Sequence, residues 1–177
     1  DQIPFHVKQI WDIVQSNFPD VGVKGILISE VTSESYVYSP GHTVVLLKHL
    51  EEADVTAAGR SCWNEVDCWE PTLDGMLTNN FEPRPVWWVN YWYASLEGQS
   101  YATESEMKGI TAFAVQRPKG VSVLLGFSEA AGPKSSVDVH LHFKNQDKLQ
   151  ARIKNFHPGE ARLLEFSDGN VKISVAR

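Results

Sequence analysis

The 177-residue sequence is poor in cysteine and in excess positive charge, and it lacks a long apolar run. Its two cysteines, Cys62 and Cys68, have no histidine near them in the sequence, so a structural zinc site is not expected. No segment resembles the ~20 apolar residues that cross a bilayer, which argues against a membrane-spanning helix. The net charge of −6 argues against nucleic acid as the main partner. The sequence also lacks a glycine-rich phosphate-binding loop.

Charged and aromatic residues are distributed unevenly along the chain. Residues 1–99 carry fourteen acidic and five basic side chains, whereas residues 100–177 carry eight acidic and eleven basic ones. All six tryptophans also lie in the first of these segments. We therefore predict two chemically different regions, 1–98 and 99–177.

The first region alternates between helical and strand patterns. Apolar residues at helical spacing predict helices over 5–18 and 42–53, and an aromatic-rich helix after Pro85 that ends at Gly98. Short apolar runs predict strands over 24–29 and 56–62, with the first buried on both faces. This order is typical of βα units, so we predict that the two strands are adjacent and parallel.

The second region has a different period. Six or seven short apolar segments from Ser100 onward, separated by turn sequences, predict an antiparallel β-sandwich. Within one of these segments Asp138, His140 and His142 alternate with apolar residues, which is typical of a strand with one face in water. The two histidines share that face and have the spacing of a metal site. A solvated strand face is favoured because no third ligand lies nearby, and no metal is predicted.

Functional residues of parallel α/β sheets lie at the carboxyl ends of the strands. Glu30 ends the first predicted strand, where a carboxylate is well placed to act as a nucleophile or, alternatively, to cap a helix or form a salt bridge. Trp63 ends the second strand and provides either a stacking surface for a sugar ring or core packing. The local pattern leaves both alternatives open for each residue.

Several segments taken together resemble a known family. GILISEVTSESY (25–36), AGRSCW (58–63), LDGML (73–77), the helix after Pro-Arg-Pro and the trailing strands resemble the C-terminal half of a clan A glycoside hydrolase. The nearest likeness is to the family 39 β-xylosidases and iduronidases. The resemblance implies a fold of α/β plus all-β class, in which the last two βα units of a (β/α)8 barrel precede a C-terminal β-sandwich.

The same resemblance implies roles for particular residues. Glu30 matches the catalytic nucleophile at the end of barrel strand seven, and Trp63 matches the aromatic residue after strand eight. Tyr36, Asn64 and Glu65 are the further candidates for contact with the sugar. Asn64-Glu65 looks like the acid/base motif of the clan, but it follows the nucleophile instead of preceding it. Glu65 is therefore assigned to an acidic loop that binds sugar hydroxyls or is simply solvated.

The chain departs from the family in its length. A complete barrel takes ~250 residues, and only about 99 precede the predicted sandwich. Barrel strands one to six and the acid/base glutamate have no counterpart here. The resemblance thus implies a complementary polypeptide that supplies them, and a retaining glycoside hydrolase that is active when assembled, without a cofactor. The alternative is a non-catalytic, lectin-like carbohydrate-binding protein or a structural protein.

The cysteine pair and the first residue bear on location. Cys62 and Cys68 either close a small loop as a disulfide or remain free thiols. The sequence starts at Asp1 without an initiator methionine or an apolar leader, so we expect a removed leader or a cut from a longer chain. A disulfide would favour a secreted or extracellular protein.

Overall fold

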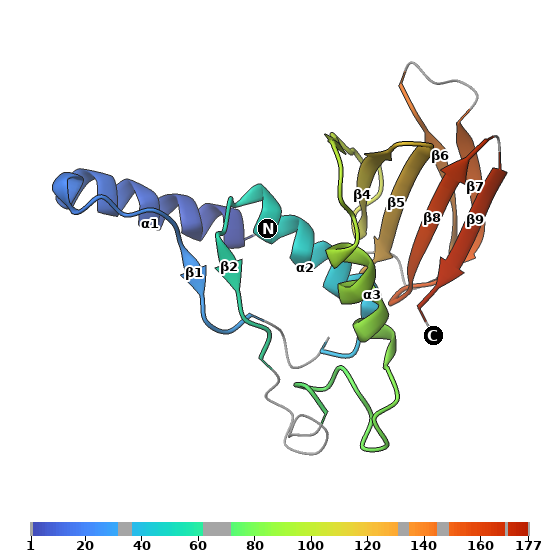
Figure 1. The fold of residues 1–177 in the computed structure, drawn as a ribbon, viewed down its shortest axis with the longest axis horizontal. Coiled ribbons are helices and arrows are strands. Elements are labelled where there is room, and N and C mark those ends of the chain that lie inside the picture. Colours follow the sequence, from blue (N-terminus) through green and yellow to red (C-terminus); the bar gives the residue numbers. More distant parts are fainter. Residues whose placement is uncertain are drawn as a thin grey trace.

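The structure is a computed structural model, and it describes residues 2–31, 37–61, 72–130, 135–144, 149–168 and 170–176. These residues form a mixed α/β protein with a strand-rich C-terminal part. The elements in chain order are α1 (Ile3–Asn17), the 3-10 helix η1 (Pro19–Val21), β1 (Leu27–Ile28), α2 (Pro40–Glu52), β2 (Ala57–Ala58), α3 (Pro85–Ala94), β3 (Ser100–Tyr101), β4 (Ile110–Arg117), β5 (Gly120–Phe127), β6 (Val137–His142), β7 (Gln150–Phe156), β8 (Ala161–Ser167) and β9 (Asn170–Val175). Figure 1 shows α1, β1 and β2 at one end, the large sheet at the other, and α2 between them.

The three helices lie where the apolar spacing predicts them, and each has a proline as its first or second residue. Pro4, Pro40 and Pro85 occupy the first turns, where a fixed φ suits the helix and the missing N–H has no intrahelical partner to lose. Ser39 caps α2 by accepting a hydrogen bond from the backbone N–H of His42 at 3.2 Å. A cap of this kind contributes about 1 kcal/mol to stability.

The aromatic helix α3 ends at Ala94, before the predicted end at Gly98. The guanidinium of Arg117, at the end of β4, donates hydrogen bonds to the backbone carbonyls of Ser95 and Glu97. These carbonyls belong to the residues that follow the helix, and a cation is favourable at a helix C-terminus. Arg117 therefore ties the end of α3 to the sheet.

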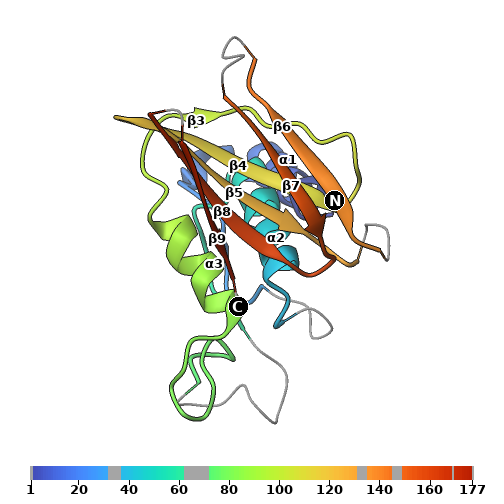
Figure 2. The ribbon, with the colours of Figure 1, turned by 90° about the vertical axis from the view of Figure 1, so that its right-hand side faces the viewer.

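The seven predicted C-terminal strands are all present, although β3 is reduced to two residues. Five of them form an antiparallel sheet in the order β3-β4-β5-β8-β9, and β6 and β7 form a separate antiparallel pair. Figure 2 shows this pair in front of the five-stranded sheet, with α2 and α3 behind the sheet. The large sheet therefore has one face covered by strands and the other by helices.

Strand β5 is buried on both faces for this reason. Val123, Leu125 and Phe127 point toward the β6–β7 pair and form one core with Ile153 and Phe156 of β7. The residue between them, Leu124, belongs to a second core, whose other buried members are Val44, Val89, Trp92, Ala161, Leu163 and Ala176. Helices from the predicted first region and strands from the predicted second region thus share this second core.

Two glycines allow α2 to approach the sheet closely. A Cβ atom on Gly41, in the first turn of α2, would lie 2.1 Å from the carbonyl oxygen of Phe127. A Cβ atom on Gly126 would lie 2.4 Å from the Cβ of Val44. Real Cβ atoms do not come this close to such neighbours, so both positions require glycine if α2 is to keep its place.

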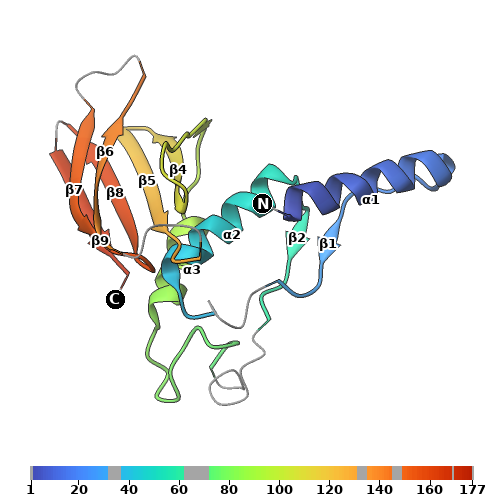
Figure 3. The ribbon, with the colours of Figure 1, turned by 180° about the vertical axis from the view of Figure 1, so that it is seen from behind.

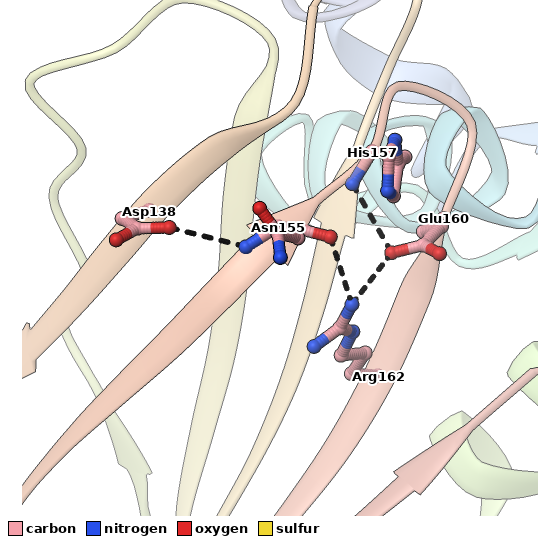
Figure 4. Close-up of polar contacts among 5 residues, drawn as sticks. All are labelled: Asp138, Asn155, His157, Glu160 and Arg162. Atoms are coloured by element: carbon pink, nitrogen blue, oxygen red, sulfur yellow. Dashed lines mark hydrogen bonds and ion pairs between the residues drawn. The ribbon is translucent and has the colours of Figure 1, made fainter.

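A polar network holds the β7–β8 turn and the β6–β7 pair (Figure 4). Arg162 bonds to the carboxylate of Glu160 at 2.8 Å and to the carbonyl of Asn155 at 3.3 Å, and the backbone N–H of His157 also donates to Glu160. The N–H of Asn155 donates to the carboxylate of Asp138 at 3.1 Å. Asn155 has a φ of 49°, so this bond holds an otherwise unfavourable backbone conformation.

We expect Leu124→Ala to lower the free energy of unfolding by about 2–5 kcal/mol, because a fully buried leucine leaves a cavity. Since the same core includes α2, α3 and the sheet, the urea unfolding transitions observed by far-UV circular dichroism and by tryptophan fluorescence should have the same midpoint, and the substitution should lower both midpoints equally. Val171→Ala, at a residue that is 39% exposed, is the matched control and should change stability by under about 0.5 kcal/mol. Two separate transitions would contradict a shared core.

Histidine 42 should make the fold sensitive to acid. Its ring lies 3.1 Å from the hydroxyl of Ser128, and burial lowers its pKa, with Glu129 opposing and His49 adding to that shift. The folded state therefore favours the neutral imidazole of His42. The contribution of His42 to the free energy of unfolding is complete above pH about 6.5, the pKa of histidine in the unfolded chain. It is lost as the pH falls below that value and through the lower pKa of His42 in the folded state.

The measurement is the free energy of unfolding between about pH 8 and pH 5 for the wild type and His42→Gln. The difference between the two proteins should shrink as the pH falls. His157→Gln, at an exposed histidine, is measured in parallel as the control. A constant difference for His42→Gln would show that His42 does not act in this way.

Candidate functional site: the carboxyl edge of β1 and β2

The two predicted early strands are adjacent and parallel, as expected. Leu27 pairs with Ala57 and Ile28 with Ala58. The ladder continues through backbone bonds from Thr56 N to Ile26 O, from Gly59 N to Ile28 O, and from Val31 N to Gly59 O, at 2.8–2.9 Å. Figure 1 shows both strands ending on the side of the molecule where the loop 72–84 lies. The carboxyl ends of both strands therefore share one edge.

Both strands are shorter and more exposed than predicted. Each has two residues, and Leu27 is 69% exposed although its run of apolar residues predicts burial on both faces. The physical reason is that β1 and β2 form a two-stranded sheet, with no further strand on either side among the described residues. A two-stranded pair without neighbouring strands leaves much of its side-chain surface open to water.

Glycine residues allow the backbones of the two strands to approach closely at both ends of this pair. A Cβ on Gly59 would lie 2.5 Å from the carbonyl oxygen of Ser29, and one on Gly25 would lie 2.0 Å from the hydroxyl oxygen of Thr56. A side chain at either position would push the strands apart. The backbone after β1 is thus fixed against β2 up to Val31, which places the intervening Glu30.

Glu30 follows β1 by two residues and lies at this shared edge, as predicted. Its side chain is exposed, so the carboxylate is open to solvent and to a ligand. On one side the ladder bond of Val31 to Gly59 holds its backbone. The structure therefore fixes the backbone that carries this carboxylate at the end of the strand.

Arg60 is a second charged residue at this edge, and sequence reasoning did not single it out. It follows β2, and its guanidinium donates hydrogen bonds to the carbonyl of Val37 and, at 3.3 Å, to that of Asp74. Burial lowers its pKa, while Asp74 and Tyr38 oppose that shift. Arg60 therefore joins the segment before α2 to the loop that precedes α3. The sequence feature that could have pointed to Arg60 is its position directly after the second predicted strand.

The loop 72–84 has its own internal support. Leu77 bridges to Pro83, and the backbone N–H of Phe81 bonds to the carbonyl of Thr78 at 2.9 Å. Arg84 donates to the carbonyl of Leu77 at 3.1 Å, and its guanidinium lies 4.7 Å from the ring centre of Tyr38. Arg60 and Arg84 thus attach the same loop to the segment that contains Val37 and Tyr38.

All of the other predicted site residues lie outside the described part of the chain. These are Tyr36, Cys62, Trp63, Asn64, Glu65 and Cys68. The predicted sugar contacts therefore stay predictions, and the choice between a disulfide and free thiols at the cysteine pair stays open. Of the predicted site residues, Glu30 is the one whose position the structure describes.

The described residues constrain what this edge can bind. Among them, no group of three histidine, cysteine, aspartate or glutamate side chains has the arrangement of a metal site. The helices of the described part are also too short or too polar to cross a membrane. The edge combines the exposed carboxylate of Glu30 with the half-buried guanidinium of Arg60, which donates to two carbonyl groups.

No family model, no curated protein and no solved structure matches the chain.

Arg60→Met should loosen the loop 72–84, because the carbonyls of Val37 and Asp74 lose their donor. We expect a loss of about 1–3 kcal/mol in stability and faster hydrogen exchange and proteolysis within 72–84. Arg152→Met removes an exposed guanidinium on β7 and is the control, with exchange in 72–84 unchanged. Wild-type exchange rates in this loop for Arg60→Met would show that Arg60 does not anchor it.

Proposed function

We propose that this chain is part of a retaining glycoside hydrolase in which Glu30 is the catalytic nucleophile. The observation that carries the proposal is the parallel pairing of β1 with β2, which places Glu30 at the carboxyl edge of a βα-type sheet. Functional residues of such sheets lie at that edge. The resemblance of the segments around 25–36 and 58–63 to clan A hydrolases independently selects the same residue.

The proposal includes a finer description of the fold. β1 and β2, with α2 between them in sequence, are the seventh and eighth strands of a (β/α)8 barrel, and α3 is its last helix. The five-stranded sheet and the β6–β7 pair that packs against it are a C-terminal β-sandwich. The common core of Phe127, Phe156 and their neighbours supports this second assignment.

In the proposed reaction the carboxylate of Glu30 attacks the anomeric carbon and forms a covalent glycosyl-enzyme. A second carboxylic acid, carried by the complementary polypeptide, protonates the departing glycosidic oxygen. The same residue then removes a proton from water, which attacks the anomeric carbon, releases Glu30 and restores the original configuration. The two carboxyl groups must lie about 5–5.5 Å apart for this outcome.

The complementary polypeptide is supported by the surfaces around α1 and β1. Phe5, Ile13 and Phe18 of the α1 region are each 57–59% exposed, and Leu27 of β1 is more exposed still. Figure 3 shows α1 and β1 at the end of the molecule farthest from β6–β9. Apolar patches and unpaired strand edges of this kind usually have a partner. We assign them to the remaining barrel strands and helices.

A carbohydrate substrate follows from the same proposal, with Trp63 and Tyr36 as stacking residues and Asn64 and Glu65 as polar contacts. The reaction needs no cofactor, because two carboxyl groups supply the acid, the base and the nucleophile. A secreted or extracellular location accompanies the proposed disulfide between Cys62 and Cys68.

The test is Glu30→Gln in the assembled enzyme, assayed with aryl glycosides. We expect a loss in kcat of at least about 10³-fold with little change in sugar binding, because the amide retains the shape but cannot form the glycosyl ester. Glu104→Gln, at an exposed carboxylate between β3 and β4, is the control and should keep wild-type activity.

Covalent trapping provides a second readout of the same test. A 2-deoxy-2-fluoro glycoside with an activated leaving group should label the wild type, and peptide mass mapping should place the label on Glu30. Undiminished hydrolysis by Glu30→Gln, or a label on another residue, would contradict the proposal. Sugar binding without any hydrolysis in the assembled wild type would favour the non-catalytic carbohydrate-binding alternative.

A further inference from the structure

The outer face of β6 carries two exposed imidazole rings, those of His140 and His142. They alternate with Val139 and Leu141, which pack toward the core. Their ring centroids lie 6.4 Å apart, and the ring planes differ by only 9°. Neither ring makes a hydrogen bond to another residue within the described part of the chain, so their nitrogen lone pairs are available.

We propose that His140 and His142 form a two-imidazole binding site for a late first-row divalent cation, and that Cu²⁺ is the ion bound most tightly. Imidazole suits Cu, Ni and Zn, and affinity among these divalent ions is highest for Cu²⁺. The remaining coordination positions are filled by water or by a small exchangeable ligand. This site is independent of the edge that contains Glu30.

The strand geometry supports joint coordination. A nitrogen ligand lies about 2.0–2.1 Å from such an ion, so two nitrogens that bind one ion lie within about 4 Å of each other. Residues i and i+2 project from the same face of a strand, so the two rings are neighbours, with centroids 6.4 Å apart. The nitrogen lone pairs lie in the ring planes, so the rings must turn out of their stacked orientation to point at one ion. Rotation about the side-chain bonds of two exposed histidines closes the remaining gap without moving the backbone.

The pairing of β6 with β7 holds this arrangement in place. His140 lies opposite Arg152 and His142 opposite Gln150 in the antiparallel ladder. The positive charge of Arg152 would disfavour a cation, but its guanidinium is drawn to the carboxylate of Asp138 at 2.7 Å. Asp138 lies on the same face as the histidines, and its net negative charge offsets that of Arg152.

Asp138 does not add a third ligand in this arrangement. One of its oxygens accepts from Arg152 and the other from the backbone N–H of Asn155. Figure 4 shows the second of these contacts. The site therefore has two protein ligands, which distinguishes it from a structural centre with three or four and makes the bound ion exchangeable.

The experiment is titration of the full chain with Cu²⁺ in a non-coordinating buffer near pH 7.5, after treatment with iodoacetamide. Alkylation removes any free thiol at Cys62 and Cys68 as a competing ligand. Affinity is measured by calorimetry, and ligand identity by the nitrogen hyperfine structure in electron paramagnetic resonance. The proteins compared are the wild type, His140→Ala, His142→Ala and, as a matched control at another exposed histidine, His157→Ala.

We expect the wild type and His157→Ala to bind one Cu²⁺ with the same affinity and a two-nitrogen signal. Each of His140→Ala and His142→Ala should weaken binding by at least about tenfold, since the second imidazole acts at a high effective concentration. Circular dichroism should be unchanged because both side chains are exposed. Wild-type affinity in either β6 variant, or an equal loss in His157→Ala, would overturn the proposal.

Discussion

The close packing of α2 against the end of β5 is the contact on which the rest of the described structure depends. Gly41 and Gly126 remove the side chains that would separate the helix from the sheet, and Val44 fills the space between them. Ser39 and His42 add polar contacts to Glu129 and Ser128 at the same junction. A larger residue at either glycine would displace the helix together with everything attached to it.

Helix α2 lies between two regions that differ in how much apolar surface they bury. On one side α2 and α3 cover a five-stranded sheet whose central strand is buried on both faces. On the other side β1 and β2 form only a two-residue parallel ladder, and several apolar side chains of α1 and β1, among them Phe5, Ile13 and Leu27, are exposed. The strand-rich part thus has a core of its own, whereas the parallel pair belongs to neither hydrophobic core among the described residues.

Sequence patterns predicted the elements well where the period was regular. The three helices, the parallel pairing of β1 with β2 and the seven later strands follow from apolar spacing and from proline and turn residues. The sequence did not show that α2 and α3 pack on the later sheet, because Gly41, Gly126 and Leu124 meet only in three dimensions. It also did not reveal how short and exposed β1 is, since burial depends on neighbours.

The candidate site was predictable only in part. Glu30 could be placed from the end of an apolar run, because strand ends are where parallel sheets hold their functional groups. The role of Arg60 could not be predicted, because it donates to the backbone carbonyls of Val37 and Asp74 on separate segments. Every residue has a backbone carbonyl, so the sequence does not show which ones an arginine will contact. The assignments at Trp63 and the cysteine pair stay predictions.

The most direct test of this account is sedimentation velocity of the chain alone over a wide concentration range. The account holds that β1 and α1 are surfaces of an incomplete parallel barrel that needs further strands. It predicts concentration-dependent association of the isolated chain, and a single defined complex when a polypeptide carrying the remaining barrel strands is added. A monodisperse monomer at every concentration, with no binding of that polypeptide, would contradict it.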